Sequence, residues 1–314
     1  MVNYAMIGAA GYIAPRHMKA IRETGGSLEV AFDPNDSVGI IDSHFPQARF
    51  FTEFERFDRH LDKMRRSGKG VDFVTICSPN YLHDAHVRFA LRSSADAICE
   101  KPLVLNPWNI DGLREIEEHS DKRVYTILQL RLHPAIIELK NKIAANPDRI
   151  HDVQLTYITS RGNWYDASWK GDLGKSGGIA TNIGVHFYDM LGYVFGERKH
   201  SVVHLHEDRR ASGYLEFSRA RVSWYLSISS SDLPEKVQEN QTTYRSITVD
   251  GREVEFSGGF TDLHTLSYQE ILSGNGFSLE DVRPSIELVS SIRSQVAEPN
   301  RGDVHPFARA LLRG

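Results

Sequence analysis

The sequence predicts an α/β fold, with a doubly wound N-terminal domain followed by an α+β domain that contains a large, mostly antiparallel open sheet. Over roughly the first 130 residues, nearly continuous apolar runs alternate with amphipathic ones, which is typical of parallel strands covered by helices on both faces. After Gln129 the runs become strand-like, with turn residues between them and little helix, which indicates antiparallel pairing. We therefore expect one domain over residues 1–128 and a second over residues 129–314.

The expected elements of the first domain follow one another in a regular order. Each strand is a run of apolar residues, and each helix has apolar positions on one side only. The strands cover residues 4–8, 28–33, 71–77, 95–100 and 124–129, and the helices cover 13–24, 54–67 and the stretches that begin near 82 and at 108. This alternation of strand and helix builds a doubly wound parallel sheet.

The second domain opens with a helix that follows Pro134 and ends near Asn146. The strand-like runs after it cover residues 153–161, 201–209, 212–218, 221–230, 243–251 and 252–257. Because so wide a sheet does not leave both faces in water, we expect one face to pack a helix around His186 and the other to pack a neighbouring subunit. The chain is therefore expected to form a homo-oligomer, a dimer or a tetramer, through this sheet.

The composition excludes several classes of protein. The 314 residues are 40% hydrophobic and 25% charged, the net charge is −4, and Lys and Arg are scattered, which argues against a nucleic-acid surface. No apolar stretch suits membrane insertion and the first residues lack export signals, so we expect a cytoplasmic protein. Cys77 and Cys99 end strand-like runs, where buried structural thiols are expected. His204 and His206 alternate along a strand, but no third ligand of suitable spacing accompanies them and no metal site is expected.

The first turn of the chain predicts a dinucleotide site, and so a Rossmann domain. The sequence between the first strand and helix is G-x-x-G-x-x-A, whose small residues let backbone amides approach a pyrophosphate at the helix N-terminus. Asp33 ends the next strand, where its carboxylate would accept from the adenosine ribose and repel a 2′-phosphate, so NAD is expected rather than NADP. The alternative is a turn that only tightens packing. The turn residues expected to contact NAD are Gly8, Ala10, Gly11, Tyr12 and Ile13.

The polar segments at the ends of later strands extend this site. An open α/β sheet binds its ligand at the carboxyl ends of its strands. Two neighbouring strands end in the sequences SPNYLH and EKP, and the fifth ends in a glutamine. We therefore expect the cofactor to be edged by Ser78, Pro79, Asn80, His83, Glu100, Lys101 and Gln129.

The stretch over residues 176–189, SGGIATNIGVHFYD, carries the chemical residues of the second domain. At about 100° per residue, a helix from Thr181 has apolar residues on one side and, on the other, a polar stripe of Asn182, His186, Asp189 and Tyr193. Gly177 and Gly178 allow close backbone approach, and Thr181 or Asn182 would cap the helix. The polar stripe either lines a cleft or belongs to a core-packed helix whose His186 is only half-buried.

Three motifs, GYIAPRH, SPNYLHDAH and EKPL, resemble in order and spacing the Gfo/Idh/MocA family of nicotinamide-dependent sugar and cyclitol dehydrogenases. The resemblance implies that Lys101 of the E-K-P motif sits beside the nicotinamide and the reacting hydroxyl. It continues through the family pattern G-G-x-x-x-D-x-G-x-H-x-x-D, in which this chain carries Asn182 where Asp is common. The resemblance therefore places the role of proton acceptor on His186.

Two longer strings, NWYDASWKGDLGKSGGIATNIGVHFYD and ICEKPLVLNPWNID, are similar to a narrower group of that family. Its members oxidise the 3″-hydroxyl of UDP-N-acetylglucosaminuronic acid during bacterial surface-polysaccharide synthesis. This resemblance implies a UDP-linked uronic acid as substrate and a 3-keto sugar as product, on the way to a diamino-uronic acid of lipopolysaccharide O-antigen. A pyrophosphate and a carboxylate need several donors, which the loops supply. The residues expected to bind the substrate are Asn182, Arg131, Arg161, Asn163, Trp164, Tyr165, Lys170 and Lys175.

The chemistry of alcohol oxidation fits these residues. Hydride leaves a secondary alcohol only if the hydroxyl proton leaves too, so the site needs a base near neutral pH and a donor for the developing alkoxide. His186 supplies the base, Lys101 the donor, and Asn182 orients the hydroxyl. The alternatives are a dehydrogenase of another sugar or inositol, a hydrolase that uses the cofactor as an internal redox switch, and a catalytically silent nucleotide-binding sensor. The substitution at Asn182 favours the sensor, whereas the retention of both Lys101 and His186 favours an enzyme.

Overall fold

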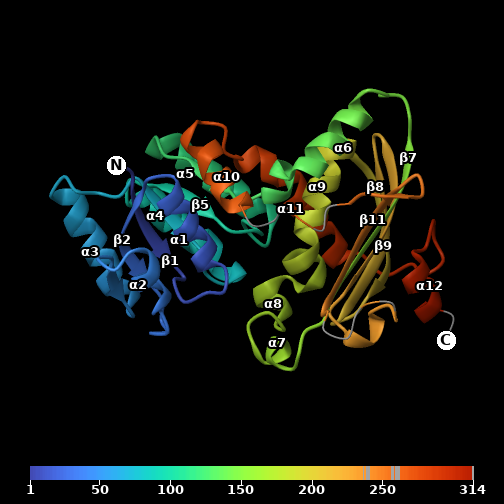
Figure 1. Cartoon of the computed structure of the whole chain (residues 1–314), viewed down its shortest axis with the longest axis horizontal. Helices are drawn as coiled ribbons and strands as arrows, with labels where there is room; N and C mark the ends of the chain where they lie inside the picture. The colour runs from blue at the N-terminus through green and yellow to red at the C-terminus, as the bar shows by residue number, and fades with distance from the viewer. Residues whose placement is uncertain (236, 238–240, 256–257, 259–261, 313–314) are drawn as a thin grey trace. The chain divides into compact units, whose positions relative to one another are not determined.

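The structure is a computed structural model of the chain, and it describes residues 1–235, 237, 241–255, 258 and 262–312 (Figure 1). The chain divides into two compact units. The first comprises Met1–Leu132 and Thr261–Arg283, and the second comprises His133–Phe260 and Pro284–Gly314. Each unit has its own six-stranded sheet.

The sheet of the first unit is parallel throughout, in the order β3-β2-β1-β4-β5-β6. This is the doubly wound order, and its switch point, where such sheets bind ligands, lies between β1 and β4. Consecutive residues of β1 from Tyr4 to Ile7 are all fully buried, so both faces of the sheet are covered. The predicted doubly wound domain is confirmed. The strands are β1 (Asn3–Ile7), β2 (Ser27–Phe32), β3 (Arg49–Phe51), β4 (Phe73–Ile76), β5 (Asp96–Cys99) and β6 (Val124–Thr126).

The helices between these strands follow the predicted alternation. Prolines stand in the first turns of α1 and α5, where a missing N–H costs nothing because no intrahelical acceptor faces it. The short α2 and β3 were not predicted, because so few residues show no clear period. The helices are α1 (Ala14–Glu23), α2 (Ile40–His44), α3 (Phe54–Arg66), η1 (Asn80–Leu82), α4 (His83–Arg92), α5 (Pro107–Ser120) and η2 (Gln129–Leu132).

The chain returns to the first unit after the second sheet. Helix α10 (Leu263–Leu272) belongs to the first unit, where Tyr268 and Ile271 join the core against α1. Helix α11 (Leu279–Ser294) then carries the chain into the second unit after Arg283. The sequence predicted that all residues after 128 belong to the second domain, with little helix, so this return was not predicted. The physical reason is that α10 buries polar as well as apolar side chains, so it lacks a clear apolar stripe.

The sheet of the second unit has the order β12-β11-β7-β10-β9-β8. Its pairs are antiparallel except for β10 and β7, which run parallel, so the predicted mostly antiparallel sheet is confirmed. The end of the predicted run 252–257 lies outside the described residues. The strands are β7 (His151–Thr159), β8 (Arg198–His206), β9 (Arg210–Phe217), β10 (Ala220–Ser227), β11 (Thr243–Val249) and β12 (Arg252–Glu253).

Helix α9 packs against one face of this sheet, as predicted. The ring of Tyr188 meets that of Trp224 on β10 edge-on, with centroids 5.3 Å apart, and Phe187 meets Tyr157 on β7 at 4.9 Å. Figure 1 shows α6 and α9 on this side of the sheet and α12 on the other. The helices of the unit are α6 (Pro134–Ala144), α7 (Trp164–Ala167), α8 (Leu173–Ser176), the π-helical turn η3 (Ala180–Gly184), α9 (Val185–Phe195), η4 (Ser230–Asp232) and α12 (Pro306–Leu312).

The C-terminal segment covers part of the opposite face of the sheet. The ring of Tyr225 on β10 stacks on His305 at 5.7 Å and on Phe307 at 5.4 Å, and Ala308 joins the same apolar cluster. Earlier in the segment, the backbone N–H of Glu298 donates to the carbonyl of residue 203 on the edge strand β8 over 2.7 Å. Residues 298–312, here called the C-terminal strap, therefore occupy a part of the face that the sequence analysis assigned to a neighbouring subunit.

Both Cys77 and Cys99 are buried free thiols, as predicted. Within the described part of the chain, no helix has the length and apolar content that spanning a membrane requires.

Candidate functional site

The turn after β1 has the geometry of a dinucleotide loop. Gly8 has a positive φ of 87°, and a Cβ at this position would lie 2.6 Å from the carbonyl carbon of Cys77. Only glycine fits both constraints. The backbone N–H groups of Gly8 and Ala9 donate to the carbonyl of Phe32, so the turn lies against the end of β2. Helix α1 then begins without a side-chain cap: the N–H of Ala14 donates to the carbonyl of Gly11 and that of Arg16 to the carbonyl of Ile13, so the backbone of the turn itself closes the start of the helix.

Asp33 lies at the end of β2, as the sequence predicted for the ribose acceptor. Its Oδ2 accepts the N–H of Ala10 over 3.0 Å and its Oδ1 accepts the N–H of Asn35 over 2.9 Å, and the residue is 6% exposed. Oδ1 also accepts from Nδ2 of Asn35 over 3.1 Å, which uses both of its lone pairs, so Oδ2 is the oxygen that retains acceptor capacity for a ribose hydroxyl. Gln129 adds a buried Oε1 with no partner among the described residues. The glycine turn, the uncapped helix and this carboxylate together fit a dinucleotide.

The segments after β4 and β5 are joined by His83. Its ring is buried, and its Nδ1 lies 2.7 Å from the carbonyl oxygen of Pro102 while its Nε2 lies 2.7 Å from that of Ser78. Burial lowers the pKa of His83, and the two carbonyl acceptors and the nearby Glu100 oppose that effect. The ring therefore ties the Ser78 segment to the E-K-P motif, so its nitrogens hold the protein loops together. Ser78 also contacts His86, with Oγ 2.8 Å from Nδ1.

Glu100 has a different environment from the one that sequence reasoning implied. It was predicted as a cofactor contact, but its Oε1 lies 3.0 Å from Nε2 of both His17 and His264. Burial acts to raise the pKa of Glu100, yet the hydrogen bonds from these two histidines outweigh it and hold the pKa well below its usual range. His264 comes from α10, the segment that was not expected in this unit. The Lys101 backbone N–H donates to the other carboxylate oxygen over 3.2 Å.

In the second unit, Asn182 and His186 lie on either side of a change in helix type. The residues of η3 form a π-helical turn that runs directly into α9, so the helix begins before Thr181 and neither Thr181 nor Asn182 caps it. The cap prediction was therefore wrong. Asn182 and His186 are partly exposed, but Asp189 is only 5% exposed and does not belong to a solvated face. Such π turns occur frequently at functional sites because they reset the helical phase.

The loop over residues 160–176 holds most of the predicted substrate ligands. Asn182 donates from Nδ2 to the hydroxyl of Tyr165 over 2.9 Å, and burial raises the pKa of that tyrosine. Lys170 Nζ lies 4.2 Å from the ring centroid of Trp169 and 6.0 Å from that of Trp164. Three further predicted ligands of this loop, all of them in the second unit, are Arg161, Asn163 and Lys175.

Arg131 differs from the other predicted substrate ligands. It belongs to the first unit, and its guanidinium donates to Asp281 Oδ1 over 3.2 Å and to the Asp281 carbonyl over 2.8 Å. The same group lies 5.1 Å from the ring centroid of Phe277. Much of its donor capacity is therefore used within its own unit. Lys175, by contrast, forms an ion pair with Asp172 at 3.4 Å near the surface. A surface ion pair is weak, so Lys175 can exchange Asp172 for a ligand anion at little cost.

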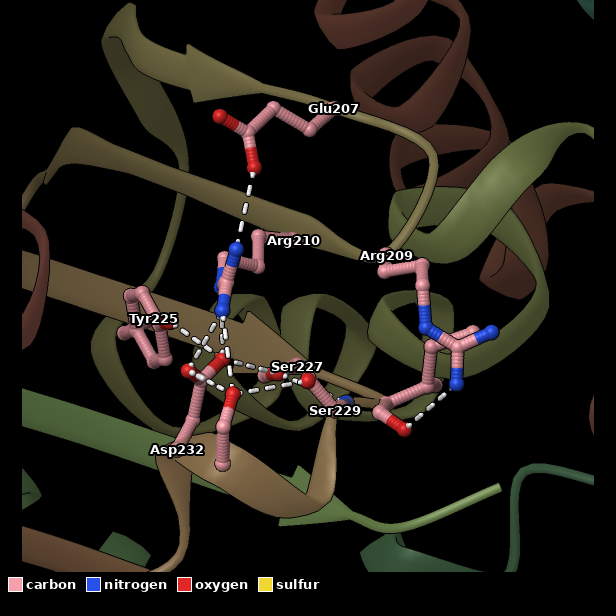
Figure 2. A network of polar contacts seen from close by, with 9 residues as sticks. Glu207, Arg209, Arg210, Tyr225, Ser227, Ser229 and Asp232 are labelled. Atoms are coloured by element: carbon pink, nitrogen blue, oxygen red, sulfur yellow. Dashed lines mark hydrogen bonds and ion pairs between the residues drawn. The ribbon is translucent and has the colours of Figure 1, made fainter. Parts of the chain in front are cut away.

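Arg209 anchors the 160–176 loop and was missed by sequence reasoning. It donates to Asp166 Oδ2 over 2.6 Å and to the carbonyl of Arg161 over 2.8 Å, which fixes both ends of the segment around α7. Figure 2 shows it beside the network in which Arg210 pairs with Asp232. Arg209 directly precedes Arg210, the first residue of β9, and these consecutive arginines were the available signal.

One cluster among the described residues has the composition of a metal site. His17, Glu100 and His264 place their ligand atoms within 4.8 Å of one another. His204 and His206 were the histidines that the sequence pattern singled out, and His204 Nε2 lies 2.5 Å from the carbonyl oxygen of Arg301. The members of the cluster are far apart in the sequence, so no motif spacing indicated them.

Comparison with protein families decides the class of the chain. Residues 2–127 match the GFO_IDH_MocA model, described as an oxidoreductase family with an NAD-binding Rossmann fold. Residues 148–232 match the model of the C-terminal alpha/beta domain of the same family. The chain belongs to the Gfo/Idh/MocA oxidoreductase family. Its two matched regions lie in the two units described above.

Solved structures and curated proteins of the Gfo/Idh/MocA family place the chain within it. The WlbA (WbpB) dehydrogenase from Thermus thermophilus, crystallised with NAD and alpha-ketoglutarate and again with NAD and UDP-GlcNAcA, is 49% and 48% identical, with a TM-score of 0.94 in both cases. Each match covers 98% of this chain and 100% of that one. The inositol 2-dehydrogenase of Rhizobium meliloti is 25% identical over 64% of this chain, and the myo-inositol 2-dehydrogenase of Thermotoga maritima is 30% identical over 42% of this chain. The matches span 57% and 38% of the lengths of these two proteins, so each covers less than two thirds of the relative.

Proposed function

We propose that this protein is an NAD-dependent dehydrogenase that oxidises the 3-hydroxyl of UDP-N-acetylglucosaminuronic acid to the 3-keto sugar. The observation that carries the proposal is the 48% identity, over 98% of the chain, with a dehydrogenase crystallised with NAD and UDP-GlcNAcA. The inositol dehydrogenases match at lower identity and over less of the chain. The nucleotide sugar is therefore favoured over inositol as the substrate.

NAD is assigned to the first unit on the chemistry of its residues. The glycine turn and the uncapped N-terminus of α1 would hold the pyrophosphate, and Asp33 would accept from the adenosine ribose. The carboxylate of Asp33 would also repel a 2′-phosphate, so NADP is disfavoured. The remaining contacts come from the segments after β4 and β5, and from Gln129. When bound, the cofactor supplies the hydride acceptor.

The reaction divides its tasks between two side chains. Oxidation moves a hydride from C3 to the nicotinamide and a proton from the C3 hydroxyl to a base, which leaves a ketone. We assign the base to His186, because a neutral imidazole accepts a proton near neutral pH. We assign Lys101 to the developing alkoxide, because an ammonium donor stabilises that negative charge more strongly than the neutral hydroxyl. Asn182 orients the hydroxyl without adding charge.

Substrate selection is assigned to the loop over residues 160–176. UDP-N-acetylglucosaminuronic acid carries a pyrophosphate and a carboxylate, which require cationic donors. Arg161, Lys170 and Lys175 supply such donors on one loop, which Arg209 anchors. Trp164 is 54% exposed and offers a ring for stacking. Arg131 remains a weaker candidate, because its guanidinium already pairs with Asp281.

The test is NAD reduction, followed by the absorbance of the reduced nicotinamide. We expect turnover with UDP-N-acetylglucosaminuronic acid and a kcat/KM at least roughly 100-fold lower with UDP-N-acetylglucosamine, because a cation built for the carboxylate would be left unpaired. Equal activity on the two sugars would refute the role of the carboxylate. Activity only on inositol or free sugars would refute the nucleotide-sugar assignment, and binding without turnover would indicate a sensor.

The assembly and pathway are part of the same proposal. We infer a homo-oligomer, a dimer or a homotetramer, that forms through the face of the second sheet that the C-terminal strap covers in part. Polar side chains such as Gln154, Ser223 and Glu216 are partly exposed there and suit a second copy with hydrogen-bonding surfaces. Sedimentation of the purified protein measures the stoichiometry. The 3-keto sugar suits amination toward a diamino-uronic acid of lipopolysaccharide O-antigen, made in the cytoplasm.

A further inference from the structure

Three segments that are distant in sequence meet at the carboxylate of Glu100. His17 of α1 and His264 of α10 each place Nε2 3.0 Å from Glu100 Oε1, and the backbone N–H of Lys101 donates to Oε2 over 3.2 Å. The three side chains are almost fully buried, with 0%, 2% and 6% exposure for His17, His264 and Glu100. Both oxygens of the carboxylate therefore accept hydrogen bonds from within the first unit.

The hydrogen bonds of this cluster have a single consistent direction. Because the pKa of Glu100 is held low, its carboxylate only accepts, and each histidine Nε2 must carry a proton. Burial lowers the pKa of His17, so its ring is neutral and its Nδ1 accepts from the hydroxyl of Tyr268, 2.9 Å away. Thr75 Oγ1, 2.8 Å from that hydroxyl, donates to it in turn. The chain of donors runs from Thr75 through Tyr268 and His17 to Glu100.

This arrangement restrains the residue that follows Glu100. A buried carboxylate that loses an N–H donor bears an uncompensated desolvation cost, so it stays where its donors are. Those donors lie on α1 and α10, and the same carboxylate binds the backbone of Lys101. The position of the Lys101 backbone is therefore tied to two helices. His83 restrains the following residue through the carbonyl of Pro102.

We propose that Glu100, His17, His264 and Tyr268 are positioning residues for Lys101, holding the backbone from which its ammonium reaches the reacting hydroxyl. The proposal rests on the proposed function, because it takes Lys101 as the group at that hydroxyl. It also explains the return of the chain to the first unit. His264 and Tyr268 stand four residues apart, on one face of α10, and both contact the Glu100 and His17 pair directly.

The same side chains could instead hold a metal ion, and the experiment separates the two cases. A metal would replace both Nε2 protons, because imidazole binds a cation through an unprotonated nitrogen. In the hydrogen-bonded cluster both protons are present. Metal analysis of the purified protein should give far less than one equivalent of any transition metal. One equivalent bound, and lost in the Glu100→Gln variant, would overturn the proposal.

Three variants test positioning without cofactor or substrate. Glu100→Gln removes the charge, and Tyr268→Phe deletes one hydroxyl from the chain of donors. Tyr4→Phe is the matched control, because its buried ring lies 5.9 Å from that of Tyr268 while its hydroxyl lies outside the chain. In the ¹⁵N-histidine spectrum, Glu100→Gln should shift the Nε2–H signals of both His17 and His264. Tyr268→Phe should shift the signal of His17 alone, and Tyr4→Phe should shift neither signal. Backbone amide exchange over residues 99–103 should be accelerated by the first two substitutions and not by the control.

Kinetics then separate positioning from simple support of the fold. Glu100→Gln should lower kcat by roughly tenfold or more, and Tyr268→Phe by about threefold, while KM for both substrates changes little, because a misplaced alkoxide donor costs transition-state stabilisation. Wild-type kcat in Glu100→Gln, or unchanged amide exchange in that variant, would overturn the inference. A wild-type protein that does not oxidise the nucleotide sugar would refute the proposed function, and the spectra and exchange rates would still decide whether the cluster holds Lys101.

Discussion

The neutral, buried His305 of the C-terminal strap predicts a measurable loss of stability in acid. Its Nδ1 accepts the N–H of Phe307 over 3.3 Å, so its proton lies on Nε2, which donates to Thr156 Oγ1 over 3.0 Å. The ring is 0% exposed and stacks on Tyr225. A second proton would sit on Nδ1 and face the Phe307 N–H. Burial accordingly lowers the pKa of His305 from 6.5 to about 3.

The sign and size of the effect follow from proton linkage. Below its ordinary pKa of 6.5, the unfolded chain binds a proton at His305 that the folded protein refuses, so stability falls as the pH falls. Between about pH 8 and about pH 5 the loss is about 2 kcal/mol, because the unfolded histidine is then mostly charged and the folded one remains neutral. This loss of free energy depends little on the pKa of His305 in the folded protein, as long as that pKa stays well below about pH 5.

Urea unfolding at the two pH values measures this loss. Three of the four tryptophans, Trp164, Trp169 and Trp224, lie in the second unit, so tryptophan fluorescence reports mainly on it. The His305→Asn variant keeps an acceptor for the Phe307 N–H and cannot titrate, so it should lose about 2 kcal/mol less than wild type between the two pH values. His206→Asn, an exposed position on the same sheet, is the control. Equal losses in wild type and His305→Asn would show that His305 titrates normally, and would refute the reasoning.

Three further predictions concern the proposed chemistry and the nucleotide turn. His186→Asn should lower kcat by roughly 10²- to 10⁴-fold with little change in nucleotide-sugar affinity, and wild-type turnover would remove His186 from the mechanism. Asp33→Ser should move the NAD/NADP preference toward NADP by about tenfold or more, measured as the ratio of kcat/KM values; an unchanged ratio would place Asp33 outside the pocket. Gly8→Ala should lower the melting temperature far more than Gly25→Ala. Both positions have positive φ, but a Cβ meets backbone at 2.6 Å only at Gly8, and similar losses would contradict that crowding.

The parts of the fold and site that depend on local sequence could be predicted. The turn at Gly8 and the acid at Asp33 are set by neighbouring residues, and a strand-helix alternation reads directly as a doubly wound sheet. The partners of Glu100 could not be predicted, because His264 lies 164 positions away and only tertiary packing brings it to the carboxylate. The π turn before α9 was missed for a related reason, since a periodicity argument assumes the α-helical angle throughout. Arg131 was assigned from its charge alone, which says nothing about a neighbouring carboxylate.

The departure of Asn182 from the family pattern is consistent with catalysis once its partner is considered. Its Nδ2 donates to the hydroxyl of Tyr165, whose pKa burial raises, so the phenol stays protonated and keeps its own O–H to donate. An aspartate at position 182 could not donate a hydrogen bond. It would accept the O–H of Tyr165 and place a negative charge four residues before His186. A carboxylate there would raise the pKa of the histidine and compete for the hydroxyl proton. With the amide, the proposed mechanism has one base, His186, and Tyr165 remains a directed donor. The substitution is therefore compatible with the proposed proton transfer to His186.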